Sequence, residues 1–338
     1  MDGAAEHPAA RVLPGPVNGR FEPAGTWNKR RVTSGPKLRS REGLVPTVLV
    51  AIVAIGLGLA WWILQSGNST RTPPGPGGKL AWPPPRLAHP KTVDVSTGAR
   101  VLQLDPKRDY VVKMPSRPLV GGDGLAISGG HNVVLIGGSI VVPPQGLAAT
   151  GEQRRGLFLK AQTGTIHVEG LRIGGRGLAE GIDLDERLGA TVQLENLRVD
   201  GLRARDEVHF TDNHDDVIQT WAGPARLRVD RLTGHTDYQG LFLNPQQFPP
   251  HRRPILFDLR HVNIVGGRTA GFLLWQTTPF PLHVSQVWVR PPRGRGPRLS
   301  LWPSPRRWRG VRLGVPRGGD FVPPGGAGLD YRSPGYVG

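Results

Sequence analysis

A two-part motif recurs along the middle of this 338-residue chain and limits the folds open to it. Each copy begins with a run such as GLFLK, at Gly156, or GIDLD, at Gly181. A second run follows the rule apolar-x-apolar-x-x-apolar-x-apolar, as in VQLENLRV, residues 192–199. Successive copies start 32, 25, 36, 23 and 31 residues apart. Repeats of this length, built only from strands and turns, indicate a solenoid or a propeller.

A parallel β-helix fits these repeats better than a propeller does. A propeller blade needs four strands in about 40 residues, which is more than most of these units hold. Alternation along each first run assigns its side chains to two faces. The inward positions are Leu125, Leu157, Ile182, Ile218, Leu241 and Phe272, followed by Ile127, Leu159, Leu184, Thr220, Leu243 and Leu274. The outward positions are Ala126, Phe158, Asp183, Gln219, Phe242 and Leu273, followed by Ser128, Lys160, Asp185, Trp221, Asn244 and Trp275.

Two stretches carry a family resemblance. HNVVLIGGSIVV, with a Gly-Gly corner between two strands, and the DDVIQTW run resemble rungs of the right-handed, pectate-lyase-like β-helix superfamily. The resemblance covers about residues 91–290. It implies an all-β fold, a right-handed single-stranded parallel β-helix. The superfamily includes lyases, hydrolases, epimerases and non-enzymatic adhesion domains, so it leaves the activity open.

The flanks of the repeat have different compositions. Residues 1–43 lack hydrophobic periodicity and predict a disordered cytoplasmic basic tail. Residues 44–65 contain 21 uncharged positions, LVPTVLVAIVAIGLGLAWWIL, which predict one transmembrane helix with its N-terminus inside. A cleaved signal peptide is the alternative. Residues 66–90 read as a Pro/Gly-rich linker, and residues 291–338 as a basic Gly/Pro-rich C-terminal tail that could pack back on the repeat.

The net charge of +17 suggests nucleic-acid binding until it is divided among these segments. The flanks 1–43, 66–90 and 291–338 carry +4, +3 and +7, which leaves only +3 for residues 91–290. A basic groove with interleaved aromatics is absent from the repeat sequence, so nucleic acid is not an expected partner. The chain has no cysteine, which excludes disulfides and thiolate metal sites.

The outward positions predict a polysaccharide-binding strip. Indole rings stack on sugar faces, while amides and carboxylates bind hydroxyl groups. The expected substrate-binding residues are Lys160, Asp183, Asp185, Gln219, Trp221, Tyr238, Asn244 and Trp275. The alternative is that the N-terminal segment or the C-terminal tail covers these aromatics.

The stretch from Thr211 to Pro245 holds the densest cluster of reactive side chains. We expect catalysis, if any, from His214, Asp215, Asp216 and His235, because glycoside hydrolysis uses paired carboxyl groups. The Asp-Asp pair before an apolar strand resembles the Asp-Asp segment of polygalacturonase-type hydrolases, and Gly234-His235 resembles part of their Gly-His-Gly motif. Thr236 replaces the second glycine, and the Asn-x-Asp and Arg-x-Lys segments are missing.

A lyase is the other catalytic reading. It needs a base, here Tyr238, His235, His214 or Lys160, and a group that neutralises a uronate carboxylate. Ca²⁺ held by Asp183, Asp185 and Asp215 or Asp216 would supply the latter. The structural alternative is that Asp216 and Gln219 only satisfy turn backbone groups. The sequence thus predicts a membrane-anchored, extracytoplasmic β-helix that binds and cleaves an envelope or extracellular polysaccharide, or a non-catalytic glycan-binding or scaffold module.

Overall fold

The computed structural model describes residues 79–338 except 96–98, 147–148, 204–214 and 337–338. The predicted cytoplasmic tail, membrane span and most of the linker lie outside these residues. Within them, no helix is long and apolar enough to cross a bilayer.

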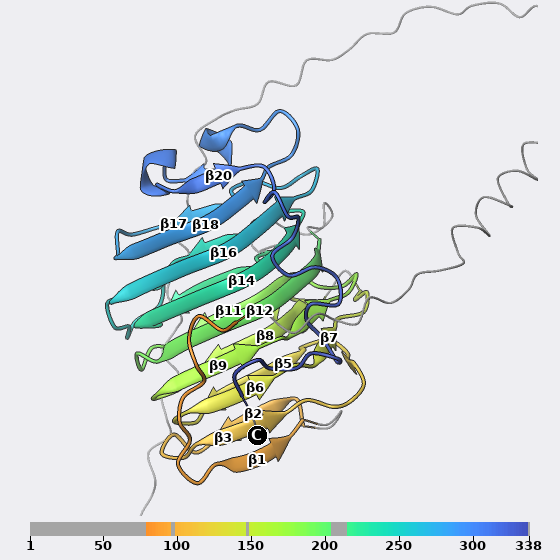
Figure 1. Ribbon diagram of the computed structural model, residues 1–338, viewed down its shortest axis with the longest axis vertical. Coiled ribbons are helices and arrows are strands. Elements are labelled where there is room, and N and C mark those ends of the chain that lie inside the picture. Colours follow the sequence, from red (N-terminus) through yellow and green to blue (C-terminus); the bar gives the residue numbers. More distant parts are fainter. Residues whose placement is uncertain (1–78, 96–98, 147–148, 204–214, 337–338) are drawn as a thin grey trace, which may run out of the picture. The chain divides into compact units, whose positions relative to one another are not determined.

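Parallel strands stacked one above another form the body of this part of the chain (Figure 1). The chain passes alternately through two sheets, so that each sheet gains a strand per coil, as in a parallel β-helix. All the strand ladders are parallel; the described residues add one isolated antiparallel bridge, Ala222 with Gln246. The repeat prediction is therefore confirmed at the level of a β-helix-like solenoid.

One sheet has eight strands. In chain order they are β2 (Val101–Leu104), β5 (Leu125–Gly129), β8 (Arg155–Lys160), β11 (Glu180–Asp185), β13 (Ile218–Ala222), β15 (Leu241–Leu243), β17 (Leu274–Gln276) and β19 (Leu301–Trp302). These are the first runs of the sequence motif. Their inward side chains, such as Leu157, Ile182 and Ile218, are completely buried and form one stacked core column.

The other sheet has twelve strands and holds the second runs. Its main path is β1 (Lys91–Asp94), β3 (Tyr110–Lys113), β6 (Val133–Ile136), β9 (Thr165–Glu169), β12 (Thr191–Leu202), β14 (Arg226–Thr236), β16 (Leu256–Gly266), β18 (Leu282–Arg290) and β20 (Val311–Leu313). Three short strands continue it beyond a bend: β4 (Leu119–Val120), β7 (Ser139–Val141) and β10 (Arg172–Gly174). Three 3-10 helices complete the described elements: η1 (Glu152–Arg154), η3 (Pro297–Leu299) and η4 (Pro305–Arg307).

The two-residue step in the second run is a bend in the strand. On each coil one residue there has a positive φ: Gly137, Gly170, Asn196, Arg231, His261 and Gln286. Because this left-handed residue uses an extra position, the apolar side chains before and after it both point into the core. Left-handed backbone costs a non-glycine residue about 1–2 kcal/mol, which packing on both sides of the bend must offset.

Two residues depart from the motif: Val217 stands where the other first runs begin with glycine, and Gly234 stands at the last apolar position of its second run. Their side-chain sizes compensate at the corner before the eight-stranded sheet. A Cβ added to Gly181 would lie 2.9 Å from Cγ1 of Val199. One coil later the large and small residues change places: a Cβ on Gly234 would lie 2.8 Å from both Cγ atoms of Val217. Gly234 therefore has a packing role.

The structure corrects the expected register at the end of the repeat. Leu274 pairs with Leu241, and Trp275 pairs with Phe242, so the last predicted run enters the sheet two residues late. Leu273, predicted to face outward, is completely buried. In the sequence GFLLW, Phe272 and Leu274 can each take the first inward position. Leu274 takes it, and Phe272 instead stacks on the outside against Trp275, with ring centroids 5.2 Å apart. The coil also continues past residue 290, since β19 pairs with β17 and β20 with β18.

Both flanking segments of the described domain contact the outer face of the twelve-stranded sheet (Figure 1). The backbone N–H groups of Ala81 and Trp82 donate to the two carboxylate oxygens of Glu195, at 2.8 and 2.9 Å. The C-terminal segment runs back across the strands, where Asp320 accepts a hydrogen bond from Asn263 at 2.9 Å and Tyr331 contacts Glu169 and Asn196. The predicted tail does pack back on the solenoid.

Candidate functional site

Charged residues on successive coils lie one above another at the corner where the chain enters the eight-stranded sheet. Arg155, Glu180 and Asp216 each precede the corner residue of their coil, and successive coils bring them together. Arg155 Nε donates to Glu180 Oε2 at 3.2 Å and also to Asp183 Oδ2. All of these side chains are at least nine-tenths buried. The turns thus concentrate charge at one corner of the solenoid.

Asp215 and Tyr238 extend this cluster on the side of the next coil. The carboxylate of Asp215 lies 3.9 Å from the guanidinium of Arg154, and both groups are buried. Arg154 also donates to the backbone carbonyls of Gly177 and Arg203, at 3.1 and 2.9 Å. We call Glu180, Asp183, Asp215 and Asp216, with Arg154 and Arg155, the carboxyl cluster.

The carboxyl cluster holds four acids and two guanidinium groups, so burial favours protonation of the excess acids. Burial and the charges of Glu180 and Asp215 raise the pKa of Asp216 well above its ordinary value. Burial and Glu180 likewise raise the pKa of Asp183, although Arg155 opposes the shift. Burial, Asp216 and Asp215 also raise the pKa of the Tyr238 phenol. Burial in this cluster therefore raises the pKa of at least two of its carboxyl groups, those of Asp183 and Asp216.

An aromatic strip lies on the outer face of the same sheet. Trp275 and Trp302 are stacked with ring centroids 5.0 Å apart and planes 29° apart, and Phe242 lies 5.4 Å from Trp275. A second group continues the strip, in which Trp221 lies 5.4 Å from Phe158 and 6.2 Å from Phe248. Trp302 and Phe248 are 39% and 45% exposed. The complete aromatic strip is Phe158, Trp221, Phe242, Phe248, Phe272, Trp275 and Trp302.

The acids and the aromatics share one outward column. From strand to strand this column reads Phe158, Asp183, Gln219, Phe242, Trp275 and Trp302. Asp183 and Gln219 nevertheless lie beneath the surface, because the guanidinium of Arg155 sits 4.6 Å from the Phe158 ring and 5.1 Å from the Trp221 ring. Gln219 Oε1 makes no hydrogen bond with the described residues. The predicted strip of exposed polar side chains is therefore interrupted, because Arg155 covers Asp183 and Gln219.

The second outward column differs more from expectation. Trp221 occupies a register shift, so that Ala222 pairs with Asp185 in its place. Asp185 is nearly buried and accepts two hydrogen bonds of 2.8 Å from Arg187, while Lys160 approaches to 4.0 Å. Asn244 accepts a hydrogen bond of 2.6 Å from the Thr277 hydroxyl.

The calcium hypothesis gains no support from this arrangement. Arg187 donates to both carboxylate oxygens of Asp185, and Arg155 donates to Oδ2 of Asp183. In the part of the chain that the structure describes, no three His, Cys, Asp or Glu side chains are grouped as a metal site requires.

The predicted catalytic histidines are separated from the acids. His235 lies on β14, on the outer face of the other sheet, where its Nδ1 is 2.9 Å from Asp200 Oδ1. The backbone carbonyl of Asp215 contacts this coil and accepts a hydrogen bond from the Gln239 N–H at 3.0 Å. His214 lies outside the described residues. The structure therefore brings Asp215 and Asp216 together without His235.

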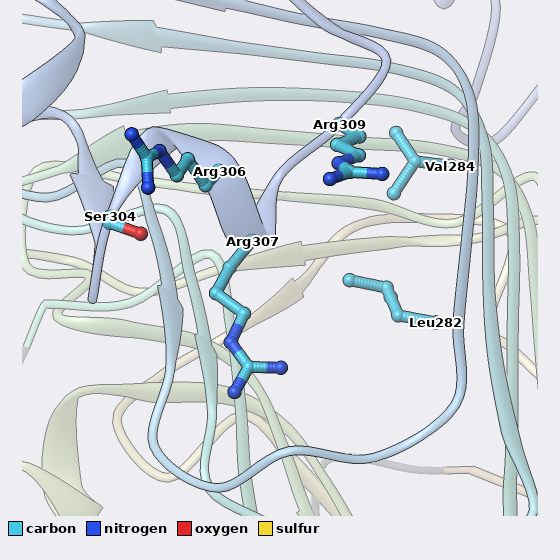
Figure 2. A pocket seen from close by; sticks show the side chains of 6 residues that line it. All are labelled: Leu282, Val284, Ser304, Arg306, Arg307 and Arg309. Carbon is cyan, nitrogen blue, oxygen red and sulfur yellow. The ribbon is translucent and has the colours of Figure 1, made fainter.

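Two depressions lie away from the aromatic strip. One, of about 580 Å³, opens between the start of β18 and η4 and is lined by Leu282, Val284, Ser304, Arg306, Arg307 and Arg309 (Figure 2). The other, of about 440 Å³, contains His235 and Asp200.

Sequence reasoning missed the residues that organise the cluster, namely Arg154, Arg155 and Glu180. A signal was available, because the residue before the corner position is charged on three successive coils. Glu186 was also missed. It is completely buried, and burial raises its pKa to about 8 although the Gln162 N–H donates to it at 2.9 Å.

Comparison of this chain with protein-family models, curated proteins and solved structures finds no match.

Proposed function

We propose that this chain is a right-handed parallel β-helix protein that binds a polysaccharide along its aromatic strip. The single observation that carries the proposal is the stacked, partly exposed pair Trp275 and Trp302, in line with Phe242. The outward column from Phe158 to Trp302 spans five strand spacings, or about 24 Å, which suits an extended chain of several sugars. The right-handed sense is the one that parallel crossover connections overwhelmingly adopt.

The placement of the flanking segments supports this proposal over a covered face. The N-terminal segment and the part of the C-terminal segment that follows β20 contact the twelve-stranded sheet: Trp82 lies 4.8 Å from the guanidinium of Arg260, and Val322 N–H donates to the Thr233 hydroxyl at 3.0 Å. Neither contact involves the aromatic strip. Exposed aromatics of this kind mark ligand or partner surfaces.

The test measures glycan binding by the purified full-length chain. Soluble fragments of a neutral β-glucan and of polygalacturonate are titrated into wild-type protein and Trp302→Ala. Loss of one stacking ring, worth about 1–1.5 kcal/mol, predicts binding weakened about tenfold. Trp288→Ala is the matched control, because Trp288 lies on the outer face of the other sheet. Equal binding by wild type and Trp302→Ala contradicts the proposal.

A second candidate function is glycoside hydrolysis, and the carboxyl cluster favours it. Asp216 fits the role of general acid, because burial and neighbouring acids raise its pKa well above the ordinary value. Asp215 beside Arg154 would act as the ionised base or nucleophile. The charges of the cluster and the contact of its Arg155 with the Phe158 and Trp221 rings of the aromatic strip support these roles.

Hydrolysis and lysis give different products, so one assay separates them. New reducing ends without unsaturated product indicate a hydrolase, and unsaturated absorbance indicates a lyase. Asp216→Asn should reduce hydrolysis by at least about 100-fold, in line with the usual effect of a general acid, while leaving glycan binding intact. Unchanged turnover in both Asp216→Asn and Asp215→Asn removes the catalytic assignment but not the binding one.

We also propose that residues 44–65 anchor the chain in a membrane with the β-helix outside the cytoplasm. The support is the 21-residue uncharged stretch and the basic residues before it. Deletion of 44–65 should move the protein from the membrane fraction to the soluble one. External protease should reach the wild-type β-helix domain in intact cells; protection of that domain contradicts the orientation.

A further inference from the structure

The second depression is independent of the aromatic strip and is built on the outside of the twelve-stranded sheet. Three arginines from separate elements line it: Arg176 after β10, Arg203 after β12 and Arg290 at the end of β18. His235 lies among them on β14. Three arginine side chains and one histidine side chain, each from a different coil of the solenoid, thus line the same depression.

The acids in this depression are already engaged. Asp200 accepts from Arg198 Nε at 2.8 Å and lies 2.9 Å from His235 Nδ1. Hydrogen bonds from His235 and Arg198 lower the pKa of Asp200 although its burial opposes the shift. Asp237 lies 4.0 Å from Arg203. Arg176 and Arg290 make no ion pair with the described residues, so two guanidinium groups remain for a ligand.

The contact with Asp200 also orients the imidazole. With Nδ1 held by the carboxylate, Nε2 of His235 makes no hydrogen bond to the described residues, and the side chain is 32% exposed. Glycines form part of the surface between the charged groups. Because glycine has no side chain, a ligand can approach the backbone there. The lining glycines are Gly175, Gly201, Gly266 and Gly267.

We propose that this depression binds a tetrahedral oxyanion of the phosphate or sulfate type, contacted by Arg176, Arg290 and, in its imidazolium form, the Nε2–H of His235. Guanidinium groups form strong charge-assisted hydrogen bonds with such oxygens. A tetrahedral anion offers oxygens in several directions, which matches donors that arrive from separate coils better than a planar carboxylate does. The proposal is independent of glycan binding by the aromatic strip.

Isothermal titration of the purified full-length chain tests the proposal with inorganic phosphate, inorganic sulfate and acetate, at physiological ionic strength. We expect saturable binding of phosphate or sulfate, and binding of acetate at least about tenfold weaker. Arg290→Ala and His235→Ala should each weaken binding about tenfold, the usual effect of removing one charge-assisted contact. Arg290 is exposed at a strand end, so that variant should keep the fold, which thermal unfolding checks.

Arg307→Ala is the matched control, because it removes an arginine from the other basic depression (Figure 2). It should leave phosphate binding unchanged, as should Trp302→Ala. Absence of saturable binding overturns the proposal, and so does a loss confined to Arg307→Ala. Equal affinity for acetate overturns the assignment of a tetrahedral ligand.

Discussion

The packing of Val217 against Gly234 predicts that two destabilising substitutions, Val217→Gly and Gly234→Val, compensate for each other when they are combined. Val217→Gly removes a completely buried side chain, whose burial contributes about 1.5–3 kcal/mol to the free energy of unfolding. Gly234→Val places new carbon atoms where a Cβ alone would lie 2.8 Å from Val217, which should cost about 1–3 kcal/mol. If the two sites acted independently, the double variant would lose the sum, about 2.5–6 kcal/mol and about 4 kcal/mol at the midpoints.

Packing predicts a much smaller loss in the double variant. With glycine at 217, the valine at 234 occupies the vacated space and reproduces the pairing of Gly181 with Val199 one coil earlier. The remaining close contact is the end of the flexible Ile264 side chain, at 3.0 Å. We therefore expect the double variant to lose about 1–2 kcal/mol, which corresponds to a coupling of about 2–3 kcal/mol.

Denaturant unfolding, followed by circular dichroism and by tryptophan fluorescence, measures all four proteins. The reversed pair, Val199→Gly with Gly181→Val, is a control that should not be rescued. A Cβ at residue 181 would also lie 2.5 Å from the backbone oxygen of Val217, which no side-chain deletion removes. Free energies of unfolding that add for Val217→Gly and Gly234→Val within about 0.5 kcal/mol would refute the reasoning.

Further predictions concern buried polar groups. Because the pKa of Glu186 rises to about 8 on folding, the folded state holds its proton more tightly and stability should fall as pH rises from about 4.5 to 8. Glu186→Gln should flatten this part of the stability profile and stabilise the protein at pH 8; an unchanged profile contradicts the assignment. Arg155→Met leaves the acids of the cluster without their main partner and should lower the free energy of unfolding at neutral pH by about 3 kcal/mol, less at acid pH. Tyr331→Phe should cost about 1–3 kcal/mol in thermal unfolding, because the phenol contacts Glu169 and Asn196; no change in melting temperature would show that these contacts are dispensable.

The repeat and its core columns were predictable because burial of alternate side chains leaves a direct trace in the sequence. Leu194 and Leu197, for example, occupy the core positions that the second-run rule assigned to them. The last coil failed for a local reason: Phe272 and Leu274 can each fill the first inward position, and only contacts with β15 select Leu274.

The candidate site was less predictable because facing outward is not the same as being exposed. Alternation placed Asp183 and Gln219 on the outer face correctly, but it carried no information about the guanidinium of Arg155 that covers them. The separation of His235 from Asp216 was also hidden, since it depends on which sheet each coil position enters. Sequence spacing alone suggested that they would meet.

The returning C-terminal segment changes how this solenoid should unfold. A solenoid in which each coil contacts only its neighbours can fray from either end, coil by coil. Here Gly328 exchanges backbone hydrogen bonds with Gly138 and Gly170, and Asp320 pairs with Arg198 on β12, four strands before the last strand, β20, of the same sheet. The segment fastens late coils to early ones, so the last coils cannot detach without releasing contacts near the first. Removal of this segment should turn one cooperative transition into gradual loss of coils.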